Sequence, residues 1–397
     1  MNILIISAVF PPEPVVSANL SRDLADELSK NNQVTVLCPK PTRPNGFIIS
    51  NNFEPKNYKV IRLNSFTCPS SNLMGRIRES FSFGRCCQNY IEANHDNIDV
   101  IYANTWPFLA QYFTVRSSKD FKIPLIIHIH DIYPESFSNK IPVLKKLLNF
   151  IFLPIDKFIL NNSTKIIAIS KNMKKYLMNT RKISEDKMLI VQNWQDENNF
   201  IEYKLQSKSD IIDKPFTFMY LGNIGPVAGV NLLLESFFNA SLKNSRLVIA
   251  GSGSMKDILK QKAFELKLDT IEFWDVPTGK VPEIQNQADV MLLPIKKGSA
   301  SSSIPSKLPA YMFSEKPIIG CVDKDSDTAK SIIEANCGWI LPPENPVLLS
   351  RLMRKVSGLS SKVLKNKGSE GFNYAINNYS KERNLIKLVN LFKQFDC

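Results

Sequence analysis

The sequence predicts an α/β protein built from two doubly wound domains, each with a parallel sheet. Short apolar runs rich in β-branched residues alternate with longer helical stretches along most of the 397 residues. The alternation stops at a polar stretch, residues 194–214, and then restarts. Strands that alternate with helices pair in parallel and carry helices on both faces of the sheet. A chain of this length also suits two domains of about 200 residues each.

The first half contains the first series of predicted strands. Each is a short run dominated by Ile, Val and Leu, as in "NILIIS" near the N-terminus. Such runs are typical of strands that are buried on both faces. The runs lie at residues 2–7, 33–38, 60–63, 99–103, 124–130, 165–170 and 188–193. Helices are expected between them, at residues 18–30, 74–93, 106–117 and 171–180.

The second half repeats the pattern after the polar stretch. Its predicted strands lie at residues 216–222, 245–251, 270–276, 289–294 and 316–322. Helical stretches separate them at residues 229–240, 255–267 and 307–314. In a doubly wound sheet, ligands bind beyond the carboxyl ends of the strands, so the residues that immediately follow each strand are the candidates for function.

Charge and cysteine content narrow the class of protein. The formal net charge is +13, and both halves of the chain share it almost evenly. Such a balance suits a partner with phosphates, which includes nucleotides, anionic membranes and nucleic acids. No basic and aromatic platform supports the nucleic-acid alternative. Seven scattered cysteines without CxxC pairs, and a first strand with no signal peptide before it, indicate a cytoplasmic protein.

One apolar segment has two interpretations. No apolar run reaches the length of about 18 residues that a membrane-spanning helix needs. The nearest candidate is "IPVLKKLLNFIFLPIDKFIL" (141–160), which lysines, prolines and one aspartate interrupt. It is either a buried helix between the domains or an interfacial helix that lies on a membrane with its lysines at the surface.

Three predicted strand-to-helix turns of the second half carry small or basic residues. They are "GNIGPVAG" (222–229), "GSGSMKD" (251–257) and the lysine- and serine-rich loop 296–306. Small residues let the backbone approach a ligand, and a helix N-terminus favours an anion. Each glycine turn alone is also consistent with a purely structural role. Because the carboxyl ends of parallel strands share one edge, the three turns are expected to lie together.

The stretch "SIPSKLPAYM" (303–312) predicts a helix that starts with a cation. Pro309 fits only in the first turn of a helix, which places Ser306 at the N-cap and Lys307 at the first helical position. A lysine there faces the positive end of the helix dipole, where a cation is unfavourable without an anion. A solvated lysine is one explanation, and a lysine that meets a bound anion is the other.

The first half ends one strand with "HIHDIYPES", which holds two of the three histidines of the chain. His128 and His130 share one face of that strand. His128 is expected to pack and hydrogen-bond in the core. A metal site formed with Asp131 is conceivable, although no further cluster of ligands supports it. His130 and Asp131 lie at the ligand-facing end, so we expect them to contact a sugar or a hydroxyl group of a substrate.

Taken together, motifs along the chain resemble the retaining glycosyltransferases of family 4 with the GT-B fold, especially the bacterial enzymes that build O-antigens, capsules and colanic acid. The resemblance runs from residue 1 to about residue 390 and is more specific than any single motif. It rests on "MNILIIS" with "FPPE", "HDIYPES", "QNW", "YLGNIG", "IAGSGS", "PSKLPAYMFSEKPIIG" and "CGWILPPEN".

The resemblance implies a division of labour between domains. Residues 1–200 would form a Rossmann-like domain that binds the acceptor, and residues 201–380 a second one that binds the nucleotide sugar. Residues 381–397, with the predicted helix "KERNLIKLVNLFKQF", would pack back towards the first domain. The donor would contact Gly222, Asn223, Gly225, Gly251, Val276, Ser303, Ser306, Lys307 and Leu308.

The chain departs from the pattern of this family at known positions. Many members carry two glutamates eight positions apart, where this chain has Ser302 and Ala310, so the usual ribose ligand is missing. Many also hold the diphosphate with an Arg and a Lys where this chain has Asn223 and Ala228. Lys307, Ser306 and backbone amides of the loops would then bind the diphosphate.

The function that these residues predict is sugar transfer. Lys307 and amide dipoles would stabilise the departing diphosphate, His130 would contact the sugar or its phosphate, and Asp131 would orient the acceptor hydroxyl or act as base. The resemblance implies no metal, retention of configuration, a donor of the UDP type, and an undecaprenyl-diphosphate-linked saccharide acceptor at the inner face of the cytoplasmic membrane. The alternatives are a catalytically silent sugar-nucleotide-binding or membrane-scaffold subunit, an epimerase of the same fold, and a nucleic-acid-binding protein.

Overall fold

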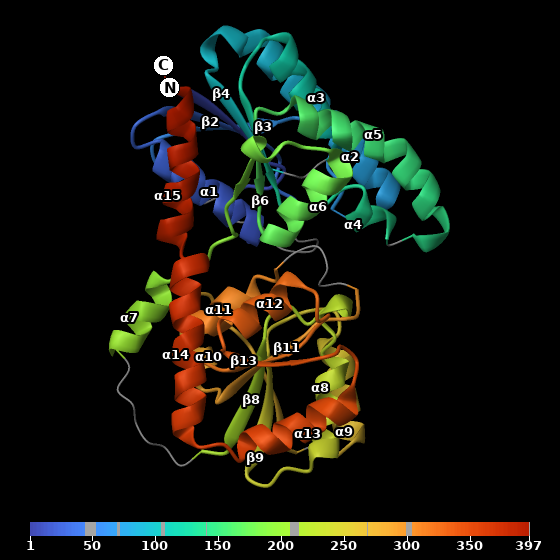
Figure 1. Cartoon of the computed structure of the whole chain (residues 1–397), viewed down its shortest axis with the longest axis vertical. Helices are drawn as coiled ribbons and strands as arrows, with labels where there is room; N and C mark the ends of the chain where they lie inside the picture. The colour runs from blue at the N-terminus through green and yellow to red at the C-terminus, as the bar shows by residue number, and fades with distance from the viewer. Residues whose placement is uncertain are drawn as a thin grey trace. The chain divides into compact units, whose positions relative to one another are not determined.

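The computed structural model describes residues 1–43, 53–69, 72–104, 108–139, 141–206, 214–267, 269–298 and 304–396 (Figure 1). The chain divides into two compact units. The first unit comprises Met1–Asn193 together with Asn384–Cys397, and the second comprises Trp194–Arg383. The chain therefore returns to the first unit at its C-terminal end.

The described part of the first unit contains one parallel sheet of seven strands, in the order β3-β2-β1-β4-β5-β6-β7. Every residue of β4 and β5 is buried, which agrees with runs that are apolar on both faces. The strands are β1 (Asn2–Ile6), β2 (Gln33–Pro39), β3 (Lys59–Leu63), β4 (Val100–Asn104), β5 (Leu125–Ile129), β6 (Lys165–Ala168) and β7 (Met188–Ile190).

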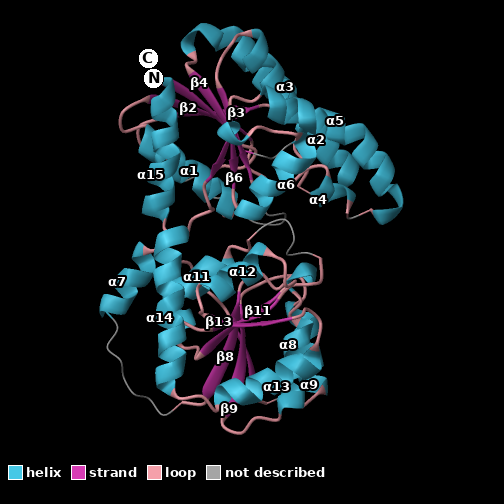
Figure 2. Ribbon diagram, viewed as in Figure 1, coloured by secondary structure: helices cyan, strands magenta, loops and turns pink. Residues whose placement is uncertain are grey.

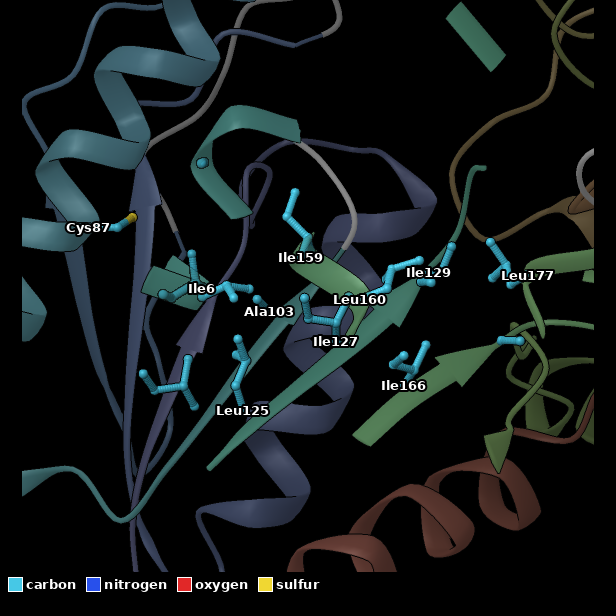
Figure 3. Close-up of a cluster of buried hydrophobic side chains, with 14 of the residues drawn as sticks. Ile6, Cys87, Ala103, Leu125, Ile127, Ile129, Ile159, Leu160, Ile166 and Leu177 are labelled. Carbon is cyan, nitrogen blue, oxygen red and sulfur yellow. The ribbon is translucent and has the colours of Figure 1, made fainter. Parts of the chain in front are cut away.

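Helices cover both faces of this sheet (Figure 2). On one face, side chains of α2, α3, α5 and α6 pack onto alternate strand residues such as Ile127 and form a large apolar core (Figure 3). The helices of the unit are α1 (Val16–Leu28), α2 (Leu73–Asn94), α3 (Phe108–Asp120), α4 (Glu135–Ser138), α5 (Lys145–Asn162) and α6 (Lys171–Arg181). Short 3-10 turns are η1 (His95–Asn97), η2 (Pro142–Leu144) and η3 (Glu185–Lys187).

The last helix, α15 (Lys381–Phe392), belongs to the first unit from Asn384 onward. Its apolar stripe is buried, with Leu388 and Phe392 almost inaccessible to solvent. The ring of Phe392 lies 6.1 Å from the ring of Tyr102 on β4, centre to centre. The 3-10 turn η5 (Lys393–Phe395) follows. The first unit is thus completed by a segment from the far end of the sequence.

The second unit has a parallel sheet of six strands among its described residues, in the order β10-β9-β8-β11-β12-β13. The strands are β8 (Phe216–Leu221), β9 (Ser245–Ala250), β10 (Ile271–Trp274), β11 (Val290–Pro294), β12 (Ile318–Cys321) and β13 (Gly338–Leu341). The strand order reverses between β8 and β11, so this is the switch point where doubly wound sheets bind ligands.

The helices of the second unit pack on both faces of its sheet, and two apolar cores result. Residue Lys307 begins the short helix that follows β11. The helices are α7 (Asn198–Gln206), α8 (Asn231–Ala240), α9 (Lys256–Glu265), α10 (Val281–Asn286), α11 (Lys307–Phe313), α12 (Asp327–Glu334), α13 (Pro346–Ser357) and α14 (Ser361–Asn378), with the 3-10 turn η4 (Pro226–Ala228).

The structure confirms the predicted fold class of two Rossmann-like units with parallel sheets. Each predicted strand is present, although most ends shift by one to three residues. One interpretation is wrong. The segment 141–160 is not a buried helix along its length, because Phe150 on α5 is 81% exposed and only Asp156, Ile159 and Leu160 of that helix are buried.

Candidate functional site

The first turn of the second unit brings Gly222 against the side chain of Lys307. Gly222 follows β8 directly and has a φ of +153°. A Cβ atom at this position would lie 2.0 Å from Cε of Lys307, closer than any real contact. Only glycine therefore leaves room for the lysine stem at the end of β8.

The neighbouring turn is pressed against the first one. Gly251 follows β9 with a φ of +126°, and a Cβ there would lie 2.2 Å from the carbonyl oxygen of Gly222. The Gly222 amide donates to Ala250 O at 3.0 Å, and the Gly251 amide donates to Trp274 O at 3.0 Å. These bonds join the carboxyl ends of β8, β9 and β10. Val276, two residues beyond β10, packs partly buried on the adjacent core.

Lys307 brings a cation to this edge. It is the first residue of α11 and is partly buried, with Nζ 5.5 Å from the centre of the Tyr220 ring. Burial lowers the pKa of its ammonium group, because water is removed from the charged form. Within the described ranges the ammonium makes no hydrogen bond or ion pair. A partly desolvated cation without a carboxylate partner is a candidate site for an anionic ligand.

A buried tyrosine fixes the base of this helix. The hydroxyl group of Tyr311, on α11, donates to Leu221 O at 2.8 Å and accepts from Leu221 N at 3.0 Å. Leu308, one residue after the lysine, is fully buried, and its amide donates to Pro305 O at 3.0 Å. Leu308 therefore anchors the helix, and its amide is already hydrogen-bonded within the fold.

One expectation about this loop needs revision. Ser306 occupies the position before α11, as predicted, but its side chain makes no capping hydrogen bond and its backbone is already helical. The hydroxyl group is exposed, so it can meet a ligand but does not cap. Ser303 lies outside the described residues.

Backbone amides of the loop after β8 are only partly available. The Ile224 amide donates to Ser252 O at 2.8 Å, so this amide and that of Gly222 are used within the fold. Among the described residues, nothing accepts a hydrogen bond from the amides of Asn223 and Gly225. These two amides are the donors that the loop can offer to an anion.

Tyr220 was not among the predicted site residues. Its ring faces the ammonium of Lys307, and its hydroxyl group donates to the carbonyl of Asn223 at 2.5 Å. Tyr220 thus contacts both the Lys307 ammonium and the loop after β8. The sequence shows only an aromatic residue on a buried strand, which is ordinary core, so no local signal marks it.

Lys256 is a second cation at this edge that sequence reasoning did not single out. Its ammonium donates to Gly251 O at 2.9 Å and to Asp275 at 2.7 Å. Unlike Lys307, it is already neutralised by a carboxylate. Ala310, at the position of the missing glutamate, is buried on α11, and the first turn of this helix carries no acidic residue.

The other predicted residues belong to the first unit. His128, at the end of β5, is 1% exposed, and Tyr102 OH lies 2.7 Å from its Nδ1. Burial and the neighbouring His130 hold the pKa of His128 well below its usual range. The expected core role of His128 is therefore what the packing shows. In the described part of the chain, no three His, Cys, Asp or Glu side chains gather as metal ligands.

His130 and Asp131 directly follow β5 and are partly buried. The rings of His128 and His130 lie 4.3 Å apart. Removal of water lowers the pKa of His130 to about 4, although a hydrogen bond with the Asn193 side chain opposes the shift. His130 is therefore neutral near pH 7, and it can exchange hydrogen bonds but adds no positive charge.

A buried ion-pair cluster holds the segment after Asp131. Arg181, at the end of α6, is 1% exposed, and its guanidinium donates to Asp156 on α5 at 2.7 Å. It also donates to both carboxylate oxygens of Glu135, at 2.7 and 2.6 Å, and to Tyr133 O at 2.5 Å. The segment that starts at Asp131 is thus fixed to two helices by one side chain.

The arrangement defines a class of protein. Two Rossmann-like units, each built on a parallel sheet, have the GT-B fold of solved glycosyltransferase structures. The chain belongs to the GT-B glycosyltransferases, because residues 17–198 match the model of Glycosyltransferase Family 4 and residues 202–371 match that of Glycosyl transferases group 1.

Individual relatives agree with this family. The chain is 25% identical over 287 residues to a probable glycosyltransferase, WbjE, of Pseudomonas aeruginosa, and the match covers 66% of each protein. It resembles the crystal structure of Anabaena HepE in complex with UDP, with a TM-score of 0.71 and 15% identity over 99% of this chain and 100% of that one. It also resembles WaaG, a glycosyltransferase of lipopolysaccharide biosynthesis, with a TM-score of 0.67 and 16% identity over 98% and 99%.

Proposed function

We propose that this glycosyltransferase transfers a sugar, with retention of configuration, from a UDP-linked donor to a lipid-linked saccharide in the assembly of a bacterial surface polysaccharide such as O-antigen or capsule. The observation that carries the proposal is Lys307, a partly buried cation packed on Gly222 without a partner among the described residues. The donor diphosphate supplies the anion that this edge lacks.

The donor side of the reaction follows from that contact. The Lys307 ammonium and the amides of Asn223 and Gly225 bind the diphosphate, and the exposed hydroxyl of Ser306 adds a hydrogen bond. When the bond between the sugar and the phosphate breaks, negative charge grows on the departing phosphate. Groups already fixed towards that charge stabilise it without further reorganisation, which is worth on the order of 2–4 kcal/mol for each such donor. The turn of Gly251 and the segment of Val276 hold the rest of the nucleotide.

The acceptor side uses the first unit. His130, neutral at pH 7, contacts the sugar or its phosphate by a hydrogen bond. Asp131 accepts a hydrogen bond from the acceptor hydroxyl and orients it, or takes its proton as the new glycosidic bond forms. Basic side chains take the place of a metal ion in this scheme, and we nominate no enzymic nucleophile.

Three relatives support the donor and the pathway class. HepE was solved with UDP, WaaG acts in lipopolysaccharide biosynthesis, and WbjE is a probable glycosyltransferase. A lipid-linked acceptor would bring this chain to the inner face of the cytoplasmic membrane as a peripheral protein. None of the described helices is both long and apolar enough to cross a bilayer.

A screen by mass spectrometry tests the proposal. Purified protein is mixed with UDP-, GDP- and TDP-sugars and with undecaprenyl-diphosphate-linked saccharides, and the masses of the products are measured. The proposal predicts a product one sugar heavier and free nucleoside diphosphate only when acceptor is present. A folded protein that binds UDP but transfers no sugar to any acceptor would contradict it, and would favour a silent binding subunit.

A further inference from the structure

The N-terminal half of α5, with the turn η2 before it, exposes large apolar side chains. Val143 is 94% exposed and Phe150 is 81% exposed, and Leu144, Leu147 and Ile151 are about half exposed. We call these five residues the α5 tip. Five exposed apolar side chains within residues 143–151 differ from single exposed apolar residues, which are normal on protein surfaces.

Only this half of the helix lacks cover. Further along α5, Asp156, Ile159 and Leu160 are buried. Ile159 and Leu160 belong to the core of the first unit (Figure 3). Figure 1 shows the N-terminal end of α5 extending away from the sheet of its own unit. The tip therefore projects from the half of α5 that packs in the core.

The charge around the tip has one sign. Between residues 136 and 155 the sequence has no Asp or Glu, but it has three lysines. Two of them, Lys145 and Lys146, are exposed at the start of α5. This helix end is apolar around much of its circumference and is flanked only by cations. It therefore matches the boundary of an anionic bilayer, where lipid acyl chains meet phosphate headgroups.

We propose that the α5 tip docks this protein on anionic membranes. Phe150, Val143 and Leu147 enter the headgroup and acyl boundary, and Lys145 and Lys146 bind lipid phosphates. The charge pattern favours a bilayer over a second copy of this chain, because this chain also carries a formal net charge of +13.

The docking surface is joined to the candidate acceptor edge within the same unit. Asp156 of α5 binds Arg181, and Arg181 binds Glu135, four residues after Asp131. The inference that docking serves a lipid-linked acceptor rests on the proposed function, whereas binding to vesicles does not.

Vesicle sedimentation tests the inference with a matched pair of variants. One carries Leu147→Ser and Phe150→Ser. The other carries Phe264→Ser on α9, where the phenylalanine is 85% exposed but lies in the second unit. Vesicles contain phosphatidylcholine with phosphatidylglycerol, or phosphatidylcholine alone. We expect the wild type and Phe264→Ser to bind the anionic vesicles, and the tip variant to bind at least about tenfold more weakly.

Further outcomes separate the explanations. Replacing Lys145 and Lys146 by Gln should weaken binding mainly at low salt. The inference is wrong if the tip variant binds anionic vesicles as tightly as the wild type does. It is also wrong if the wild-type protein does not bind anionic vesicles. A concentration-dependent dimer that the tip variant loses would also overturn it. Vesicle binding together with failed sugar transfer would reject the proposed function and leave the docking surface intact.

Discussion

The carboxyl ends of the two sheets carry opposite chemistry on the same fold. In the second unit, Gly222 and Gly251 remove side chains so that the backbone and a lysine stem can pack closely, and the lysine charge has no partner in the described residues. In the first unit, His128 and His130 are held neutral, and Arg181, which binds the segment after Asp131, is neutralised by two carboxylates.

The contrast between a charged and a neutral edge shows how the same parallel-sheet architecture can suit two kinds of ligand. An unpaired and partly buried cation is unfavourable until an anion binds, so the edge with Lys307 favours an anionic ligand. A neutral edge with a fixed loop suits hydroxyl groups, which need directed hydrogen bonds and no net charge. The fold supplies the position, and these few residues supply the chemistry.

The largest expected effect is a loss of stability in the first unit. Arg181→Met leaves the buried Asp156 and the partly buried Glu135 without their cation, so the free energy of unfolding should fall by about 3–5 kcal/mol. Urea unfolding measures it, with Arg354→Met on the exposed face of α13 as control. Because burial raises the pKa of Asp156, this carboxyl protonates readily once the arginine is gone. The loss should therefore shrink as the pH falls, and an unchanged stability would show that the cluster does not hold the unit together.

The next effect separates function from stability in the second unit. In Gly222→Ala the new Cβ displaces Cε of Lys307, a flexible side chain, so donor binding and transfer should fall about 100-fold, comparable to losing one fixed charge donor. In Gly251→Ala the new Cβ meets the backbone carbonyl of Gly222, which cannot move freely. Gly251→Ala should therefore lose more thermal stability than Gly222→Ala. Equal effects of the two variants on both activity and melting temperature would contradict this assignment.

The smallest effect concerns the neutral histidines. The pKa of His130 is lowered to about 4 in the folded protein, against about 6.5 in an unfolded chain. Between these values the unfolded chain binds a proton that the folded protein does not, so stability falls as the pH drops from 6.5 towards 4. His130→Asn should make the free energy of unfolding less dependent on pH in this window, with His95→Asn as control. A slope that does not change would mean that His130 is already charged in the fold.

Much of the fold could be predicted from the sequence because strand and helix periodicity is local. The predicted strands at residues 216–222 and 245–251 end at Gly222 and Gly251. The sequence alone therefore marked these two glycines as candidate site residues. The strand β13 was not predicted, because its four residues include Gly338, whose hydrogen atom faces the backbone of Ile318. Close approach to a neighbouring strand is a tertiary requirement that a single sequence does not show.

The site was predictable only where its residues follow strands. Lys307 and its place at the start of a helix came from Pro309, a local constraint. The ion pairs of Arg181 join residues 25 and 46 positions away, so no spacing reveals them. The absent cap of Ser306 and the occupied amide of Leu308 depend on backbone geometry at a helix end, which sequence patterns locate only within a residue or two.

The most direct test of the account measures acceptor-dependent release of UDP by the wild type, Lys307→Ala and the control Lys355→Ala, a lysine exposed on α13. If Lys307 meets the donor diphosphate, its loss should slow release by about 10²–10³-fold while the melting temperature without ligand stays unchanged. The control should turn over as the wild type does. Near-normal turnover in a folded Lys307→Ala protein would show that this lysine does not bind the donor diphosphate.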